Sequence, residues 1–308
     1  MIAPATREFR FADGAAARRH AVFVSTSPRE PWISPRTVLS LARKELRDSL
    51  RNRWFVTYTA AFAVLAIGLA YLSRVGTAMS GFAGFGATAA SLVNLVLLIV
   101  PLMALTIGAA SIAPERERGT LAYLLAQPIG RTELFLAKFV GLAGALVGSL
   151  AVGFGLSALT LARGADPRQV RLFLTLVVLA MLLALAMLSV GMLISVLARR
   201  SAAATGAAIM AWLVIVFVGD LGLMGSAVLF RLRASSLLLA SLANPAQCFK
   251  IAVIGSYDPT LDLLGPAGLY ASNTFGATGL PVVLIGCLAA WVVLPLVLAA
   301  ACFGRRPL

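Results

Sequence analysis

The stretch from Ser91 to Ala113 reads SLVNLVLLIVPLMALTIGAASIA and contains no charged side chain. A helix that crosses the hydrocarbon core of a bilayer needs roughly 20 apolar residues. The stretch therefore predicts a membrane-spanning helix, bent at Pro101 because proline removes a backbone hydrogen bond. Five more stretches are similarly apolar, residues 54–73, 139–162, 172–198, 202–224 and 280–303. Continuous runs of this length favour helices over a transmembrane barrel, so the predicted fold class is all-α with six transmembrane helices.

The composition of the whole chain supports the same class. Of the 308 residues, 60% are hydrophobic and only 12% are charged, and the mean hydropathy is +0.94. The charged fraction of an ordinary soluble domain is about a quarter. The chain is therefore predicted to be a polytopic membrane protein.

The distribution of basic residues predicts the orientation. With a cytoplasmic N-terminus, nineteen of the 26 Lys and Arg residues fall on the inner side. Positive charge accumulates on the cytoplasmic side of membrane proteins, so both termini and residues 114–138 of this multi-pass protein are predicted to be cytoplasmic. A basic rim that faces anionic membrane lipid accounts for the net charge of +14 without any nucleic acid.

Two segments precede the six-helix domain predicted for residues 54–304. Residues 1–34 contain no apolar run longer than Ala21 to Val24, which is too short for a secretory signal, and they are predicted to be a mobile cytoplasmic tail. Residues 35–53 place apolar side chains at three- and four-residue spacing between basic ones. This pattern predicts an amphipathic helix in the membrane interface. The alternative is a cytoplasmic extension of the first span.

The segment after the first quoted stretch, residues 114–138, reads PERERGTLAYLLAQPIGRTELFLAK. Four residues of alternating charge and Gly119 precede a predicted short helix at residues 121–126. Pro128 and Gly130 end that helix, because a residue before proline disfavours helical dihedrals and glycine accepts positive φ. Thr132 is predicted to cap a second helix that carries Glu133 in its first turn. The result is a helix, a turn and a helix across the cytoplasmic mouth of the bundle, suited to receiving force from a soluble partner.

Nothing in the chain predicts catalysis or a bound cofactor. The single histidine, His20, lies in the tail, and the sequence contains neither a Gly-rich phosphate loop nor a metalloprotease motif. Three cysteines at positions 248, 287 and 302 are too widely spaced to predict a zinc site or a thioredoxin-like pair. Cys248 stays a weak candidate for a metal ligand, because sulfur favours soft metals.

Ion-driven transport is also disfavoured. Coupling ions bind to ionisable groups inside the bundle, and the predicted spans contain only Asp220. The simpler interpretation is that Asp220 reaches the outer interface or pairs with Arg231 or Arg233. Energy for transport is therefore expected to come from another subunit.

Two further features are predicted to be structural. Gly144, Gly148, Gly153 and Gly155 put small residues on the third span, where another helix can approach closely. The loop at residues 225–279 is too long for a connection and too apolar for disorder, and Asn244-Pro245 ends its Leu-rich run. We expect short helices in the outer interface there, which would offer a docking surface to a partner protein outside the membrane.

The segment 114–138 resembles the cytoplasmic loop of ABC-2 type transporter permeases, in which Glu-Arg-Glu-x-Gly-Thr, Leu-Leu, a Pro and an Arg-x-Glu recur in this order. Six spans after an interfacial helix are also similar to that family, whose membrane domain is of the type V exporter kind. The resemblance implies two copies of a cytoplasmic ATPase, which bind ATP and Mg²⁺, and a second copy of this chain. It assigns coupling to the ATPase to Glu115, Arg116, Glu117, Arg118, Gly119, Thr120, Leu121, Tyr123, Leu124, Leu125, Gln127, Pro128, Arg131 and Glu133. It also predicts that reversing Glu115 and Glu117 to Lys leaves the protein inserted and uncouples ATP hydrolysis.

Residues 81–86, 95–105, 244–250 and 264–270 resemble the NosY-like permeases of this family. That resemblance implies movement of a sulfur- or copper-related species for copper-site assembly of nitrous oxide reductase in denitrification. The tail before Pro35 is longer than expected for that group. Two alternatives stay open, a general ABC-2 export permease for lipid-like or drug-like molecules and a membrane scaffold that transports nothing.

Overall fold

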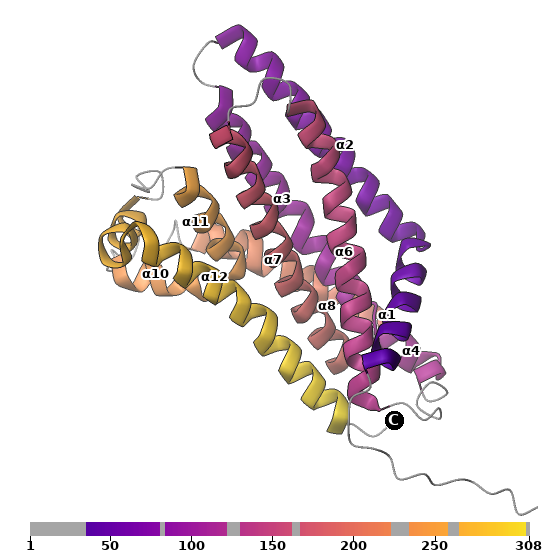
Figure 1. The fold of residues 1–308 in the computed structure, drawn as a ribbon. Helices are drawn as coiled ribbons and strands as arrows, with labels where there is room; N and C mark the ends of the chain where they lie inside the picture. Colours follow the sequence, from indigo (N-terminus) through magenta and orange to yellow (C-terminus); the bar gives the residue numbers. More distant parts are fainter. Residues whose placement is uncertain are drawn as a thin grey trace, which may run out of the picture. The chain divides into compact units, whose positions relative to one another are not determined.

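The computed structural model describes residues 35–80, 84–121, 130–161, 167–222, 234–257 and 265–305, and these residues are almost entirely helical (Figure 1). In chain order the helices are α1 (Pro35–Leu50), α2 (Arg53–Ser80), α3 (Gly84–Ala109), α4 (Ala113–Glu117), α6 (Arg131–Leu161), α7 (Pro167–Leu197), α8 (Ser201–Leu213), the π-helical η1 (Val214–Val218), α10 (Ala234–Leu242), α11 (Pro245–Tyr257) and α12 (Gly265–Arg305). The predicted all-α class is confirmed.

Five helical stretches of the described residues are long and apolar enough to cross a membrane. They are Ser91–Glu117, Arg131–Leu159, Pro167–Leu197, Ser201–Gly222 and Gly279–Arg305, and they match the second to sixth predicted spans. The first predicted span lies in α2, whose apolar part, Phe55–Leu69, is shorter. The bent pair α10 and α11 is apolar enough to form a sixth candidate. The described chain therefore contains five to six candidate spans and a shorter apolar helix.

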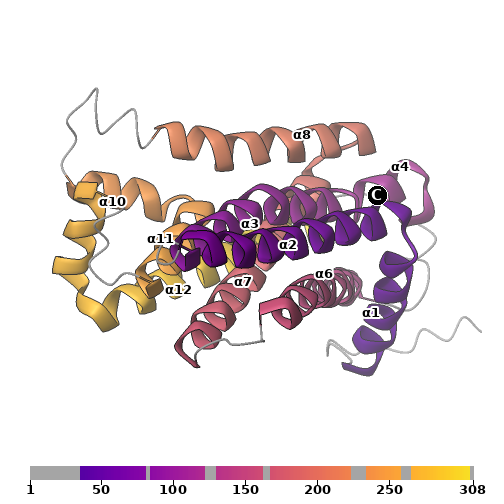
Figure 2. The same ribbon diagram turned by 90° about the horizontal axis from the view of Figure 1, so that it is seen from above.

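Helix α7 lies at the centre of the packing. It contacts α3, α12, α11 and α6, and its buried side chains occur on all sides of the helix between Leu176 and Val196. A helix that is apolar all round is typical of such an enclosed position. By contrast, α8 lies along one side of the bundle (Figure 2), and only 11% of the span that it begins is buried within the chain.

Glycines bring α3 and α7 into close contact near the α4 end of α3. A Cβ atom added at Gly191 would lie 2.5 Å from the Leu105 carbonyl oxygen, and one at Gly108 would lie 2.7 Å from the Leu188 carbonyl oxygen. Backbone atoms cannot swing aside as a flexible side chain can. The contact therefore requires glycine on both helices.

Replacing Gly191 with Ala is expected to destabilise the protein by about 1–3 kcal/mol, the usual cost of overpacking. Thermal unfolding in detergent would measure the loss. The matched control is Gly206→Ala, because a Cβ atom there meets no described atom within 4 Å and alanine favours a helix over glycine. Equal melting temperatures for the two variants would contradict the close contact.

The predicted glycine packing on the third span is partly right. A Cβ atom at Gly153 of α6 would lie 2.5 Å from the Phe62 ring of α2, whereas Gly148 and Gly155 meet no described atom within 4 Å. Gly144 is only loosely covered, by Leu46 at 3.8 Å. A close approach to the backbone of another helix was missed: a Cβ atom at Gly141 would lie 2.7 Å from the Ala42 carbonyl oxygen of α1.

The predicted amphipathic helix is present as α1, which ends at Leu50. It packs along α6 (Figure 2), and Ala42 is buried in that contact. Residues 51 and 52 separate it from α2. Helix α1 is therefore a separate element and not a continuous extension of the first span, whereas its position in the lipid interface stays a prediction.

The predicted outer loop contains more helix than expected. The run that Asn244-Pro245 was predicted to end is α10, and α11 follows after a bend of 112°. These helices do not rest on the surface, because eight residues of α11 are buried and α11 packs against α12, α7 and α3. Residues 265–279, predicted as loop, belong to α12, which is kinked at Gly276 with φ 68°.

Candidate functional site

The predicted coupling segment begins as the short helix α4 and leads into α6. Gly119 has φ 73°, whereas Gly130, where a positive φ was expected, does not have one. Helix α6 begins at Arg131, so the predicted cap, Thr132, already lies inside its first turn. The Gly130 amide instead donates to Glu133 Oε2 at 3.0 Å, which satisfies an amide just before the helix.

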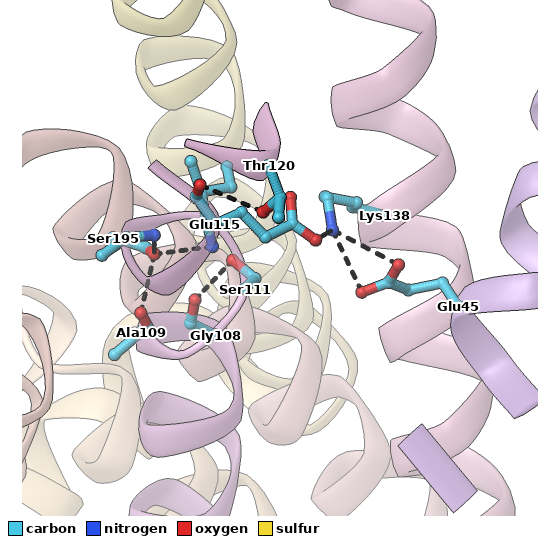
Figure 3. A network of polar contacts seen from close by, with 10 residues as sticks. Glu45, Gly108, Ala109, Ser111, Glu115, Thr120, Lys138 and Ser195 are labelled. Carbon is cyan, nitrogen blue, oxygen red and sulfur yellow. Dashed lines mark hydrogen bonds and ion pairs between the residues drawn. The ribbon is translucent and has the colours of Figure 1, made fainter. Parts of the chain in front are cut away.

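Three charged side chains from three helices meet beside α4 (Figure 3). Lys138 Nζ of α6 lies 2.6 Å from Glu115 Oε1 of α4 and 3.3 Å from Glu45 Oε1 of α1. The Lys138 side chain is only 4% exposed, and those of Glu45 and Glu115 are 23% and 29% exposed. Such a cation is stable only where carboxylates replace its hydration. The ion pairs therefore hold α1, α4 and α6 together.

The charge of this cluster does not balance. One ammonium group faces two carboxylates, and Glu115 Oε2 is buried without a hydrogen-bond partner. Burial raises the pKa of the Glu45 carboxyl; the positive charge of Lys138 opposes this rise and the negative charge of Glu115 adds to it. Protonation of the Glu45 carboxylate at acidic pH would therefore change the charge of this cluster.

The stability of the protein is expected to depend on Glu45 ionisation at weakly acidic pH. Because the folded state raises its pKa above the ordinary value of 4.5, the folded state binds the proton more tightly than the unfolded chain does. This contribution to the free energy of unfolding is full below pH 4.5 and is lost as the pH rises through the folded pKa. Unfolding measured across this range should show a weaker pH dependence in Glu45→Gln. Asp48→Asn, an exposed change on the same helix, removes only the smallest cause of the raised Glu45 pKa and should keep most of this dependence. Identical profiles for the wild type and Glu45→Gln would contradict this account.

A buried serine fixes the turn between α3 and α4. Ser195 Oγ of α7 accepts hydrogen bonds from the Ile112 and Ala113 amides at 3.0 and 2.9 Å, and it donates to the Ala109 carbonyl at 2.7 Å (Figure 3). The first amides and last carbonyls of helices have no partners within the helix. One hydroxyl thus satisfies groups at the end of α3 and at the start of α4.

The alternating charges of α4 hold the loop between α7 and α8. Arg116 Nη1 donates to the Val196 and Ala198 carbonyls at the end of α7, at 3.0 and 2.9 Å. Glu117 Oε2 accepts hydrogen bonds from the Ser201 amide and hydroxyl at the start of α8. A cation at a helix C-terminus and an anion at an N-terminus also match the two helix dipoles. The charges that were predicted to meet a partner therefore make contacts within the chain.

The remaining predicted residues fall into three groups. Leu121 is buried, the Thr120 hydroxyl donates to the Glu115 carbonyl at 3.1 Å, and Arg131 donates to the Gly304 carbonyl of α12 at 3.2 Å. Arg118 and Gly119 are exposed. Five residues lie outside the part of the chain that the structure describes: Tyr123, Leu124, Leu125, Gln127 and Pro128.

The sequence did not identify Glu45, Lys138 and Ser195 as parts of this site. A lysine placed directly before the apolar run of the third span was the available signal for Lys138, but its partners depend on the tertiary fold. The structure also changes what the double variant with Glu115 and Glu117 reversed to Lys would test. That double variant places a second cation beside buried Lys138 and breaks the contact with Ser201, so it would test the assembly of the junction and not only partner binding.

Two residues of the membrane region have neighbours that the sequence did not predict. Asp220 Oδ1 pairs with Lys250 Nζ at 2.7 Å and accepts from Gln247 Nε2 at 3.0 Å, whereas Arg231 and Arg233 lie outside the described residues. Cys248 is not isolated, because its Sγ atom lies 3.3 Å from Cys287 Sγ. Among the described residues, no group of three or more His, Cys, Asp or Glu side chains could hold a metal ion.

Comparison with known proteins agrees with this architecture. Residues 39–308 match the family described as ABC-2 family transporter protein. The chain is 34% identical over 275 residues to the protein named Probable ABC transporter permease protein NosY of Stutzerimonas stutzeri, covering 87% of this chain and 98% of that protein. It is 32% identical over 277 residues to the protein of the same name of Pseudomonas aeruginosa, covering 88% and 99%. The chain therefore belongs to the ABC-2 family of transporter permeases, membrane subunits that have no catalytic activity of their own and that work with a partner ATPase.

Proposed function

We propose that the ATPase drives this permease through the junction around α4. The main support for this proposal is that Lys138 joins α1, α4 and α6 by two ion pairs. In addition, Ser195 and Arg116 join α4 to α7, and Glu117 joins α4 to the start of α8. A displacement applied to residues 114–138 would move the ends of these helices together. Packed elements of this kind transmit rigid-body motion.

The exposed turn after α4 is the proposed point of ATPase contact. Arg118 and Gly119 are exposed, whereas the other charges of α4 make contacts within the chain. We propose that this turn and both termini face the cytoplasm of a bacterium, in its inner membrane, with two ATPase copies in the complex. A second copy of this chain would cover the face of the α8 span, which is 89% unburied within one chain.

The proposed system is the assembly of the copper site of nitrous oxide reductase. It is supported by identities of 32–34% to two proteins named NosY over almost their whole lengths. The cargo would be a sulfur- or copper-related species, and a periplasmic partner protein would receive it. Lower growth on nitrous oxide after deletion of the chain, restored by its expression, would test this step.

A second candidate function is export of a lipid-like molecule. It is favoured by a cavity of about 410 Å³ between α7, α11 and α12, lined mainly by apolar side chains together with Arg171. Ligand sites are commonly apolar with a few polar groups. Lipid transfer by the reconstituted complex would favour this candidate.

Photo-crosslinking tests the proposed ATPase contact. A photoreactive side chain in place of Arg118 is expected to capture the ATPase subunit. Arg168 is the matched control, because it is also an exposed arginine but lies at the opposite end of α7 from Ser195. Capture from position 168 and not from position 118 would reject both the contact and the proposed orientation.

A further inference from the structure

Two thiols from different helices meet beside the break between α10 and α11. Cys248 Sγ of α11 and Cys287 Sγ of α12 are 3.3 Å apart, although the residues are 39 positions apart in sequence. Cys248 is fully buried and Cys287 is partly buried, and both are free thiols. A pair of sulfur donors therefore lies where the bent hairpin packs on α12.

The two thiols share an oxygen atom at this break. The carbonyl of Leu242, the last residue of α10, accepts from Cys287 Sγ at 3.0 Å and from Cys248 Sγ at 3.4 Å. The last carbonyls of a helix lack partners within the helix, so this oxygen is available to another group. Two sulfur atoms and one oxygen atom thus surround a single position.

We propose that Cys248 and Cys287 bind one soft monovalent d¹⁰ metal ion, with the Leu242 carbonyl as a weaker third donor. Thiolates select soft ions, whereas structural zinc needs four ligands, and the described residues offer no larger group of metal ligands.

Binding is an exchange without oxidation or reduction. An ion carried as a thiolate complex passes to one cysteine, whose proton goes to the carrier: carrier-S–M + HS-Cys gives carrier-SH + M–S-Cys. The bound thiolate and the ion then form a neutral unit, which limits the cost of burial, and the second cysteine binds through a sulfur lone pair. With metal–sulfur bonds of about 2.3 Å, opening the pair from 3.3 Å by about 0.7 Å gives an angle near 120° at the ion.

The position of Cys248 and Cys287 links ion binding to the bent hairpin of α10 and α11. Opening the sulfur pair changes the contact of α11 with α12 at Cys287. The same hairpin is attached to the α8 span on its other side, through Asn244 Nδ2 to the Ile215 carbonyl at 2.6 Å and through Lys250 to Asp220. The role of the ion as cargo rests on the proposed function, whereas its binding does not.

Silver(I) is a suitable redox-inert probe for this site. The purified full-length chain, kept reduced and anaerobic, is expected to bind one tightly held Ag⁺ with sulfur neighbours in its X-ray absorption spectrum. Cys248→Ser and Cys287→Ser should each weaken binding by about 100-fold, because half of the sulfur donors are lost. Cys302→Ser is the matched control, since Cys302 also lies on α12 and is also partly buried, and it should bind as the wild type does.

Three results would overturn the site: unchanged binding in Cys248→Ser and Cys287→Ser, weakened binding in Cys302→Ser, or recovery of Cys248 and Cys287 as a disulfide from the anaerobic protein. ATPase activity of the complex is measured in parallel. Chain-dependent ATPase activity without Ag⁺ binding rejects this site and leaves the proposed coupling intact. Ag⁺ binding without chain-dependent ATPase activity supports the site and rejects the coupling.

Discussion

Lys138→Met is expected to abolish transport driven by the ATPase and to lower the free energy of unfolding by about 3 kcal/mol. Removing one partner of a buried ion pair leaves an uncompensated charge and costs about 3–5 kcal/mol. The lower value applies here, because the carboxylates of Glu45 and Glu115 keep 23% and 29% of their side-chain surface exposed. Thermal unfolding in detergent and chain-stimulated ATPase activity in proteoliposomes would measure the two effects.

Two controls separate coupling from general damage. The triple variant Glu45→Gln, Glu115→Gln and Lys138→Met removes all three charges, so it should recover most of the stability, since replacing a whole buried ion network can be neutral. Coupling should stay impaired, because ion pairs no longer join α4 to α1 and α6. Arg118→Met removes an exposed charge and should leave stability unchanged. Full transport by the triple variant would show that these ion pairs do not carry the force.

The membrane spans could be predicted because hydropathy is a local property. Each of the second to sixth apolar runs is long enough by itself to require a helix, and each forms one. The amphipathic spacing of residues 35–50 is local in the same way and gives α1. Single residues with fixed backbone preferences were partly informative: Asn244-Pro245 separates α10 from α11, but the positive φ expected at Gly130 occurs at Gly119 instead.

The partners of the polar residues could not be predicted, because they depend on which helices pack together. Glu115 and Lys138 are 23 positions apart, and Ser195 is more than 80 positions from the turn that it fixes. The alternating charges predicted contacts with another protein. In the structure, Arg116 contacts the end of α7 and Glu117 contacts the start of α8. Cys248 and Cys287 were missed for the same reason, since spacing along the chain does not show that a bent hairpin packs on α12.

Ser195→Ala is expected to reduce ATPase coupling strongly and to destabilise the protein by about 2–4 kcal/mol. The Ile112 and Ala113 amides would lose their acceptor in a fully buried site, and each unsatisfied buried group costs about 1–3 kcal/mol. Helix α4 would then be held at its start mainly by the charged contacts of Glu115 and Arg116. At a temperature where Ser195→Ala and the wild type both stay folded, the variant should therefore still show a lower chain-stimulated ATPase activity.

Ser189→Ala is the matched control for this change. Ser189 lies on the same helix and is also fully buried, but its hydroxyl donates within its own helix, to the Leu185 carbonyl at 2.9 Å. Because that carbonyl also lies within the hydrogen-bonded helix, its loss should cost little. Ser195→Thr, which keeps the hydroxyl, should retain more coupling than Ser195→Ala. If Ser189→Ala and Ser195→Ala lose coupling equally, the turn between α3 and α4 does not transmit force, and the junction acts through the ion pairs of Lys138 instead.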